Sequence, residues 1–72
     1  MSLRSGTVTE FDDPRGLGVV TDSDGRAFPF HCTAIADGTR TIAVGAVVEF
    51  AVVPGHLGRW EAAAIEPATA SR

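Results

Sequence analysis

Apolar and polar residues alternate along several short stretches of this chain, and glycine, proline and aspartate lie between those stretches. A two-residue alternation places the apolar side chains on one face of a β-strand. The strongest predicted strand is the segment 47–53, where Val48, Phe50 and Val52 alternate with Val47, Glu49, Ala51 and Val53. The pattern predicts strands over residues 6–11, 17–21, 27–32, 47–53 and 59–65.

Residues that disfavour a regular strand separate these segments. The first strand is expected to end at Asp12-Asp13-Pro14, because proline lacks an N–H and aspartate favours turns. Asp24-Gly25 predicts a hairpin turn between the second and third strands. Residues 33–36 are long enough for one helical turn. The alanines at 62–64 fit either the last strand or the start of a helix, and we favour the strand because Pro67 follows.

Pro29 lies inside the third expected strand and removes one hydrogen-bond donor from it. This strand must therefore be bulged, lie at an edge, or direct that position away from a neighbour. Five short strands with little helix predict a small all-β barrel, since closing the sheet protects edges that 72 residues cannot cover with helices. The expected core side chains are Phe28, Phe30, Val48, Phe50 and Val52.

The length of 72 residues predicts a single domain, with a core over about 5–67 and a frayed tail at 68–72. The net charge of −3 gives no argument for nucleic acid by itself, although a local basic face can still bind it. No apolar run approaches a membrane span or a signal peptide. The single Cys32 excludes an internal disulfide and suits a reducing cytoplasm, where we expect the protein to act.

The sequence offers no convincing catalytic or metal site. His31 and Cys32 are adjacent and would point to opposite faces of a regular strand, which separates a nucleophile from its base. Adding His56 gives too few and too scattered ligands for zinc. Gly16-x-Gly18 lacks the third glycine and the helix of a dinucleotide-binding fingerprint. We therefore expect no enzyme, no metal and no cofactor.

Several short motifs, taken together and in order, resemble the cold-shock domain family. They are Gly6-x-Val8-x-x-Phe11, Arg15-Gly16-x-Gly18, His31-x-Thr33-Ala34-Ile35, Gly45-x-x-Val48-x-Phe50 and the closing segment 58–65. Each motif is weak alone, and the set spans about 6–67. The resemblance implies a five-stranded antiparallel oligonucleotide-binding (OB) barrel that binds single-stranded RNA or DNA, often as an RNA chaperone.

The chain departs from the family at the exposed aromatic positions of the binding strands. The replacements are Glu10 for Trp, Leu17 and Val19 for Phe, Pro29 for Phe, and Cys32 for the aromatic after the histidine. One stacked base is worth about 1–3 kcal/mol per aromatic. We therefore expect weak binding with little sequence preference. The alternative is a protein-interaction or self-associating barrel, a homodimer or a partner's docking module, that has lost the nucleic-acid face.

The candidate nucleic-acid-binding residues combine the family positions with nearby arginine and tryptophan. They are Phe11, Arg15, Leu17, Val19, Pro29, His31, Arg59 and Trp60. Phe11 either stacks a base or caps the barrel end, and His31 either contacts a base or is a solvated strand histidine. Trp60 is either core or an exposed stacking ring. Arg15, Arg26 and Arg59 are the candidates for a phosphate-binding patch.

Overall fold

The computed structural model describes residues 3–36, 38, 40–55 and 58–68, which form five strands and one short helix. The strands are β1 (Leu3–Asp12), β2 (Leu17–Asp22), β3 (Ala27–His31), β4 (Val47–Pro54) and β5 (Trp60–Pro67). A 3-10 helix, η1 (Cys32–Ala34), follows β3. All five strands belong to one antiparallel sheet with the order β3-β2-β1-β4-β5.

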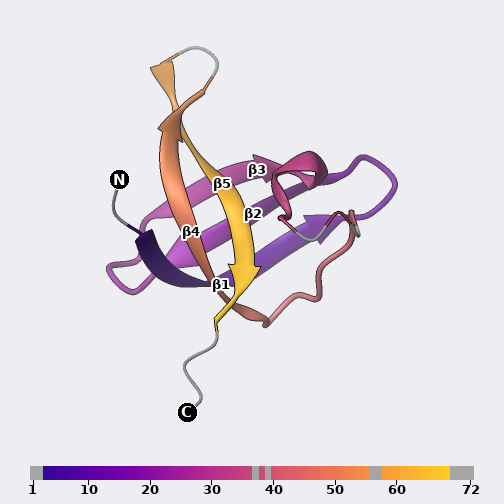
Figure 1. The fold of residues 1–72 in the computed structure, drawn as a ribbon, viewed down its shortest axis with the longest axis horizontal. Coiled ribbons are helices and arrows are strands. Elements are labelled where there is room, and N and C mark those ends of the chain that lie inside the picture. Colours follow the sequence, from indigo (N-terminus) through magenta and orange to yellow (C-terminus); the bar gives the residue numbers. More distant parts are fainter. Residues whose placement is uncertain (1–2, 37, 39, 56–57, 69–72) are drawn as a thin grey trace.

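The sheet curls so that its two ends meet. In Figure 1, β4 and β5 cross the layer formed by β1, β2 and β3. β3 and β5, at opposite ends of the strand order, lie in contact, and a parallel bridge joins Ile35 to Ile65. The small five-stranded all-β barrel expected from the sequence is therefore confirmed. Pro29 lies on β3, which has a ladder partner on only one side, and it pairs with Val19 at a position between the hydrogen-bonded pairs of that ladder, so its missing N–H costs no sheet hydrogen bond.

Distant partners explain two of the differences between the expected and the observed strand boundaries, and the other boundaries shift by one or two residues. β1 begins at Leu3 rather than at residue 6, since its first half pairs with β4 from Leu3↔Ala51 to Thr7↔Val47. The third strand ends at His31, and Cys32 starts η1. The Cys32 N–H donates to the carbonyl oxygen of Gly16 at 2.7 Å, which holds this helix against the turn after β1. Residues 62–64 form part of β5, so the strand interpretation of the alanines is confirmed.

The core fills the space between the crossed layers. Its buried residues are Val8, Val20, Phe28, Phe30, Ile35, Val48, Phe50, Ala62 and Ile65. The Phe28 and Phe50 rings meet at 5.6 Å between centroids with a tilt of 54°, a favourable aromatic arrangement. Val52 is only half-buried, because a register shift between Glu49 and Ala51 turns Ala51 inward and interrupts the alternation. Four of the five expected core side chains are thus fully placed in the core.

Asp22 is the only buried charged residue in the described part of the chain, and it closes the β2–β3 hairpin. Its Oδ1 accepts hydrogen bonds from the backbone N–H groups of Asp24 and Arg26, both at 2.9 Å. Its Oδ2 accepts a 3.1 Å hydrogen bond from Arg4 Nη1. Burial alone would raise the pKa of Asp22, but the two backbone hydrogen bonds and the charges of Arg4 and Arg26 outweigh it and lower this pKa.

Replacing Asp22 with asparagine is expected to lower the midpoint of thermal unfolding by several degrees near neutral pH. The amide places an N–H donor opposite Arg4 and removes the charge that pairs with it. Because folding lowers the Asp22 pKa, its stabilisation is complete above the ordinary value of 3.8 and is lost as the pH falls below it. The difference between wild type and Asp22→Asn should therefore shrink in acid.

Thermal unfolding followed by circular dichroism at about pH 7 and about pH 2.5 checks this expectation. Asp24→Asn is the matched control, since Asp24 lies exposed in the same turn. An equal loss of stability at both pH values, or an equal loss in the control, would contradict the role of the Asp22 charge.

Candidate nucleic-acid interface

The outer side of β1, β2 and β3 carries two rows of side chains paired across the strands. Each row starts at a carboxylate on β1, passes an aliphatic residue on β2 and ends at Pro or His on β3. The rows are Glu10–Val19–Pro29 and Asp12–Leu17–His31. Directly paired residues of neighbouring antiparallel strands point to the same side of the sheet. The register therefore brings four predicted site residues onto one surface.

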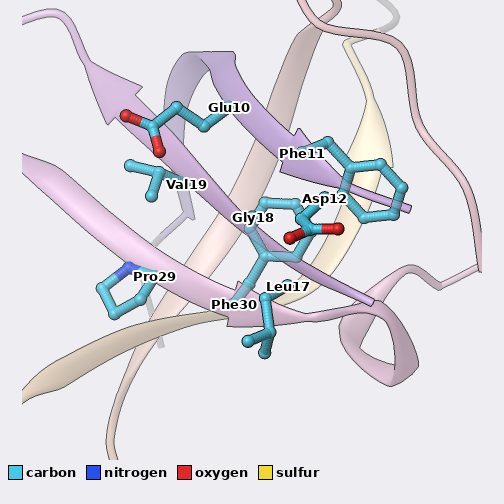
Figure 2. A pocket seen from close by; sticks show the side chains of 8 residues that line it. All are labelled: Glu10, Phe11, Asp12, Leu17, Gly18, Val19, Pro29 and Phe30. Atoms are coloured by element: carbon cyan, nitrogen blue, oxygen red, sulfur yellow. The ribbon is translucent and has the colours of Figure 1, made fainter. Parts of the chain in front are cut away.

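Between these rows lies a third pairing, Phe11–Gly18–Phe30, which points inward. Gly18 is required here by space: a Cβ on it would lie 2.5 Å from Phe30 Cζ and 2.8 Å from the Glu10 carbonyl oxygen. The ring of Phe30 consequently fills the position below Gly18, as Figure 2 shows. Without a side chain on Gly18, the rows are separated by a depression whose floor is an aromatic ring.

This depression, the central hollow, has an empty volume of about 710 Å³ and opens to solvent. Phe11, Leu17, Val19 and Pro29 form its apolar walls, and Phe30 lies at its floor. Glu10 and Asp12 contribute the charged groups among the residues that line it. The hollow offers apolar contact to a flat ring, and its charges repel anions.

Phe11 packs against the core and stacks on Phe30, with ring centroids 6.1 Å apart and planes within 10°. It is half-buried and also lines the central hollow. This packing matches the barrel-capping role considered for Phe11. The half-exposed ring also leaves room for contact with a base, which stays a prediction.

Two further hollows adjoin the central one on the side of β3 and β5. The His31 hollow is lined by Leu17, Pro29, Phe30, His31 and Glu61. The β3–β5 hollow is lined by Arg26, Ala27, Phe28, Pro29, Arg59 and Trp60. Pro29 lines all three hollows, so they follow one another around β3. Seven of the eight candidate residues gather along this run.

Arg15 is the candidate that the structure leaves outside the three hollows. It lies in the turn between β1 and β2, where its Nε is 3.6 Å from Asp12 Oδ2. Arg26 and Arg59, by contrast, line the same hollow. The three arginines considered for a phosphate-binding patch therefore do not lie together. Arg26 and Arg59 line one hollow beside β3, and Arg15 is paired with a carboxylate.

Trp60 is the first residue of β5 and its side chain is 58% exposed. The core alternative for this residue is therefore wrong. The apolar pattern of the chain does not decide the point, because Trp60 is flanked by charged residues in a short segment that fits either position. Its exposure follows from the pairing of Trp60 with Pro54 at the open end of the β4–β5 ladder.

The expectation that His31 and Cys32 point to opposite faces is also wrong, because Cys32 belongs to η1. Its Sγ lies 3.9 Å from His31 Nδ1. The same Nδ1 accepts the Thr33 N–H at 3.3 Å and lies 3.1 Å from Thr33 Oγ1. His31 thus caps η1, and its Nδ1 is occupied by this local hydrogen bonding rather than poised as a base.

The described segments contain no cluster of three or more His, Cys, Asp or Glu side chains arranged for a metal ion. His56, considered earlier as a possible ligand, lies outside the described residues. Within the same described segments, no helix is both long and apolar enough to cross a membrane.

The interface residues that the sequence did not reveal are Gly18 and Phe30 as a pair, and Asp12, which extends the charge of Glu10 into an acidic border. Phe30 was assigned to the core, which is correct, but it also forms the floor of the central hollow. Only the cross-strand register shows this. The acidic border lies along β1, and the arginines lie beside β3 and β5, so the face is polarised.

A curled five-stranded sheet with an open, partly apolar face on three strands defines an OB-type barrel. The solved structure of "drosophila Unr CSD456" has this arrangement, with a TM-score of 0.77 and 23% sequence identity. The match covers 99% of this chain and 29% of that one, so the present chain spans less than a third of that solved chain. At this identity the likeness shows the fold.

The family follows from the sequence comparisons. The family described as 'Cold-shock' DNA-binding domain matches residues 4–68. Cold shock-like protein CspA of Stigmatella aurantiaca (strain DW4/3-1) is 38% identical over 58 residues, which covers 78% of this chain and 85% of that protein. The chain belongs to the cold-shock domain family. Cold-shock domains bind single-stranded nucleic acid, and membership of this non-enzymatic family supports nucleic-acid binding in general.

Proposed function

We propose that this chain binds single-stranded RNA or DNA weakly, with little sequence preference, on the face formed by β1, β2 and β3. The observation that carries the proposal is the central hollow, whose apolar walls accept a flat base. Apart from the half-exposed Phe11, these walls are aliphatic, so most contacts are worth less than the roughly 1–3 kcal/mol of an aromatic stack.

The low sequence preference follows from the kind of contact. Leu17, Val19 and Pro29 offer apolar surface, which every base can touch with its ring face. Base identity is read by hydrogen bonds to base edges, and the charged groups of the central hollow are the carboxylates of Glu10 and Asp12. The face therefore offers apolar contact to any base and does not distinguish one base from another.

Anisotropy of fluorescein-labelled oligonucleotides of about 10 nucleotides tests the proposal at low and moderate salt. We expect dissociation constants on the order of 10–100 μM that weaken as salt rises, with similar values for dT, dA and RNA strands. Absence of salt-dependent binding at several hundred micromolar protein (roughly ten times the expected constant) would overturn it. A strong preference for one sequence would overturn the proposed lack of readout.

Replacing Glu10 with glutamine is expected to tighten binding by about twofold to threefold at low salt. The substitution removes an exposed carboxylate from the border of the central hollow, where it repels phosphate. The gain should fade at high salt, because screening already weakens this repulsion. The same anisotropy titration measures the effect.

Glu66→Gln is the matched control for Glu10→Gln. It changes the net charge equally, and Glu66 lies on the part of β5 that pairs with Glu49, outside the three hollows. Equal gains in both variants would show that only the total charge matters and that the strand does not pass Glu10.

A protein-interaction or self-associating barrel is the second candidate. It would use the same aliphatic face, on which the Leu17 side chain is 47% exposed. Sedimentation at concentrations used for the titrations distinguishes the two: a monomer that binds oligonucleotide supports the first proposal, and a concentration-dependent dimer that does not bind supports the second.

A further inference from the structure

We propose that a bound single strand continues past β3 to β5, where one base stacks on Trp60 and the neighbouring phosphates contact Arg59 and Arg26. This inference rests on the proposed function and adds a second subsite to it. It places the phosphate backbone over the β3–β5 side of the barrel rather than over β1. Three independent observations lead to it.

The first observation is the exposed indole. Trp60 leaves 58% of its side chain in solvent and lines the β3–β5 hollow together with Pro29. A tryptophan offers the largest ring face for stacking, and an accessible one beside a hollow can receive a base. The exposed apolar ring thus supplies what the central hollow lacks.

The second observation is the charge of each hollow. The charged residues that line the β3–β5 hollow are Arg26 and Arg59, and those that line the central hollow are Glu10 and Asp12. A phosphate backbone is attracted to the former and repelled from the latter. Glu61 lines the His31 hollow between them, so among the three hollows arginines line only the one beside Trp60.

The third observation is continuity. Pro29 lines the central, the His31 and the β3–β5 hollows, and it gives each of them an apolar surface. A strand can therefore keep its bases against Leu17, Val19 and Pro29 while its phosphates lie toward the arginines. Single-strand sites on OB folds cover about 4–16 nucleotides, which is long enough for both subsites to be occupied by one strand.

The test uses a strand of about 8 nucleotides with two independent readouts. Anisotropy of a fluorescein-labelled dT strand reports binding anywhere on the protein. Emission of Trp60, the only tryptophan in the chain, is measured with the unlabelled strand and reports contact at the second subsite. The proposal predicts that both signals give the same dissociation constant and that emission is quenched.

Variants at Trp60 separate stacking from general binding. Trp60→Ala is expected to weaken binding about tenfold, and Trp60→Phe, which keeps a ring, to stay within about threefold of wild type. Thermal unfolding of both variants checks that the barrel remains folded at the titration temperature. Equal losses in the two variants would contradict stacking.

Variants at Arg59 test the phosphate contact. Arg59→Gln should reduce the slope of log affinity against log salt by about 0.7, the value for one single-strand phosphate contact. Arg40→Gln is the matched control, because Arg40 changes the net charge equally and lines none of the three hollows. A slope change in the control as large as that in Arg59→Gln would count against the subsite.

The readouts distinguish the failure of this inference from the failure of the proposed function. Anisotropy that shows binding, with unchanged Trp60 emission and an unaffected Trp60→Ala variant, would overturn the second subsite and leave the function standing. Absence of any anisotropy change would overturn both. Quenching together with the predicted order of affinities, wild type, then Trp60→Phe, then Trp60→Ala, would establish the subsite.

Discussion

Phenylalanine at both positions 17 and 19 is expected to tighten the binding of a single-stranded oligonucleotide by about 100-fold. Leu17 and Val19 face outward on β2, and both line the central hollow. Each new ring can stack one base, and a stack is worth about 1–3 kcal/mol, from which the existing aliphatic contact must be subtracted. Phenylalanine also suits an exposed strand position, so the fold should tolerate both substitutions.

Anisotropy titration of the Leu17→Phe/Val19→Phe variant measures this gain directly. Val47→Phe is the control, because Val47 is an exposed aliphatic residue on β4 and lines none of the three hollows. An unchanged affinity in the double variant would show that the strand does not cross β2. An equal gain in Val47→Phe would show that an exposed ring anywhere is sufficient.

Replacing Gly18 with alanine is expected to destabilise the barrel by about 1–3 kcal/mol. The added methyl would lie 2.5 Å from the Phe30 ring and 2.8 Å from the carbonyl oxygen of Glu10, so a ring and a strand must both shift. For a chain of this length such a loss lowers the midpoint of thermal unfolding by roughly 5–20 °C. The variant should also lose affinity, since the displaced Phe30 ring changes the floor of the central hollow.

A double-mutant cycle with Phe30→Val tests the cause of this loss. Valine gives up the part of the ring that lies below Gly18, so Gly18→Ala should cost less in its presence. The recovery is expected to be partial, because the contact with the Glu10 carbonyl oxygen remains. Strictly additive losses would show that Phe30 does not occupy the space that Gly18 leaves.

Local patterns predicted the strands of this barrel, because burying one face of a strand requires apolar residues at alternate positions. Val48 and Phe50 lie on either side of the polar Glu49 in a run of β-branched residues, and Asp24-Gly25 has the chemistry of a hairpin turn, so these elements follow from nearest neighbours alone. The start of β1 could not be predicted in this way, since Leu3 is held by pairing with Ala51 far along the chain. The position of Cys32 likewise depends on the capping side chain of His31 and on Gly16.

The sequence predicted most residues of the candidate interface but did not predict how they are arranged. The order of the motifs identified Leu17, Val19, Pro29 and His31, which the register then placed in two rows. The separation of charge across the face requires knowing which strands meet, because Arg26 and Arg59 are distant in sequence and share one hollow. The contact of Arg15 with Asp12 is local in sequence, but the family motif suggested a nucleic-acid-binding role for Arg15 instead.

These features describe a cold-shock barrel that retains the family's scaffold and has altered its binding face. The aromatic platform is reduced to the half-exposed Phe11 among aliphatic walls over the buried Phe30 ring, and its β1 border is acidic. The exposed ring of Trp60 and two arginines without an ion pair among the described residues, Arg26 and Arg59, lie beside β3 and β5. We infer that the outer face of β1, β2 and β3 binds single-stranded nucleic acid with low affinity. We infer further that the adjoining surface beside β3 and β5 contributes to this binding.

The most direct test of the central claim is backbone amide NMR of the labelled protein during titration with an oligo(dT) strand. The proposed function predicts salt-sensitive shift changes at Leu17, Val19 and His31, which lie on the outer side of β2 and β3, and little change at Val47 on β4. Changes confined to β4, or none at saturating strand, would contradict nucleic-acid binding on this face.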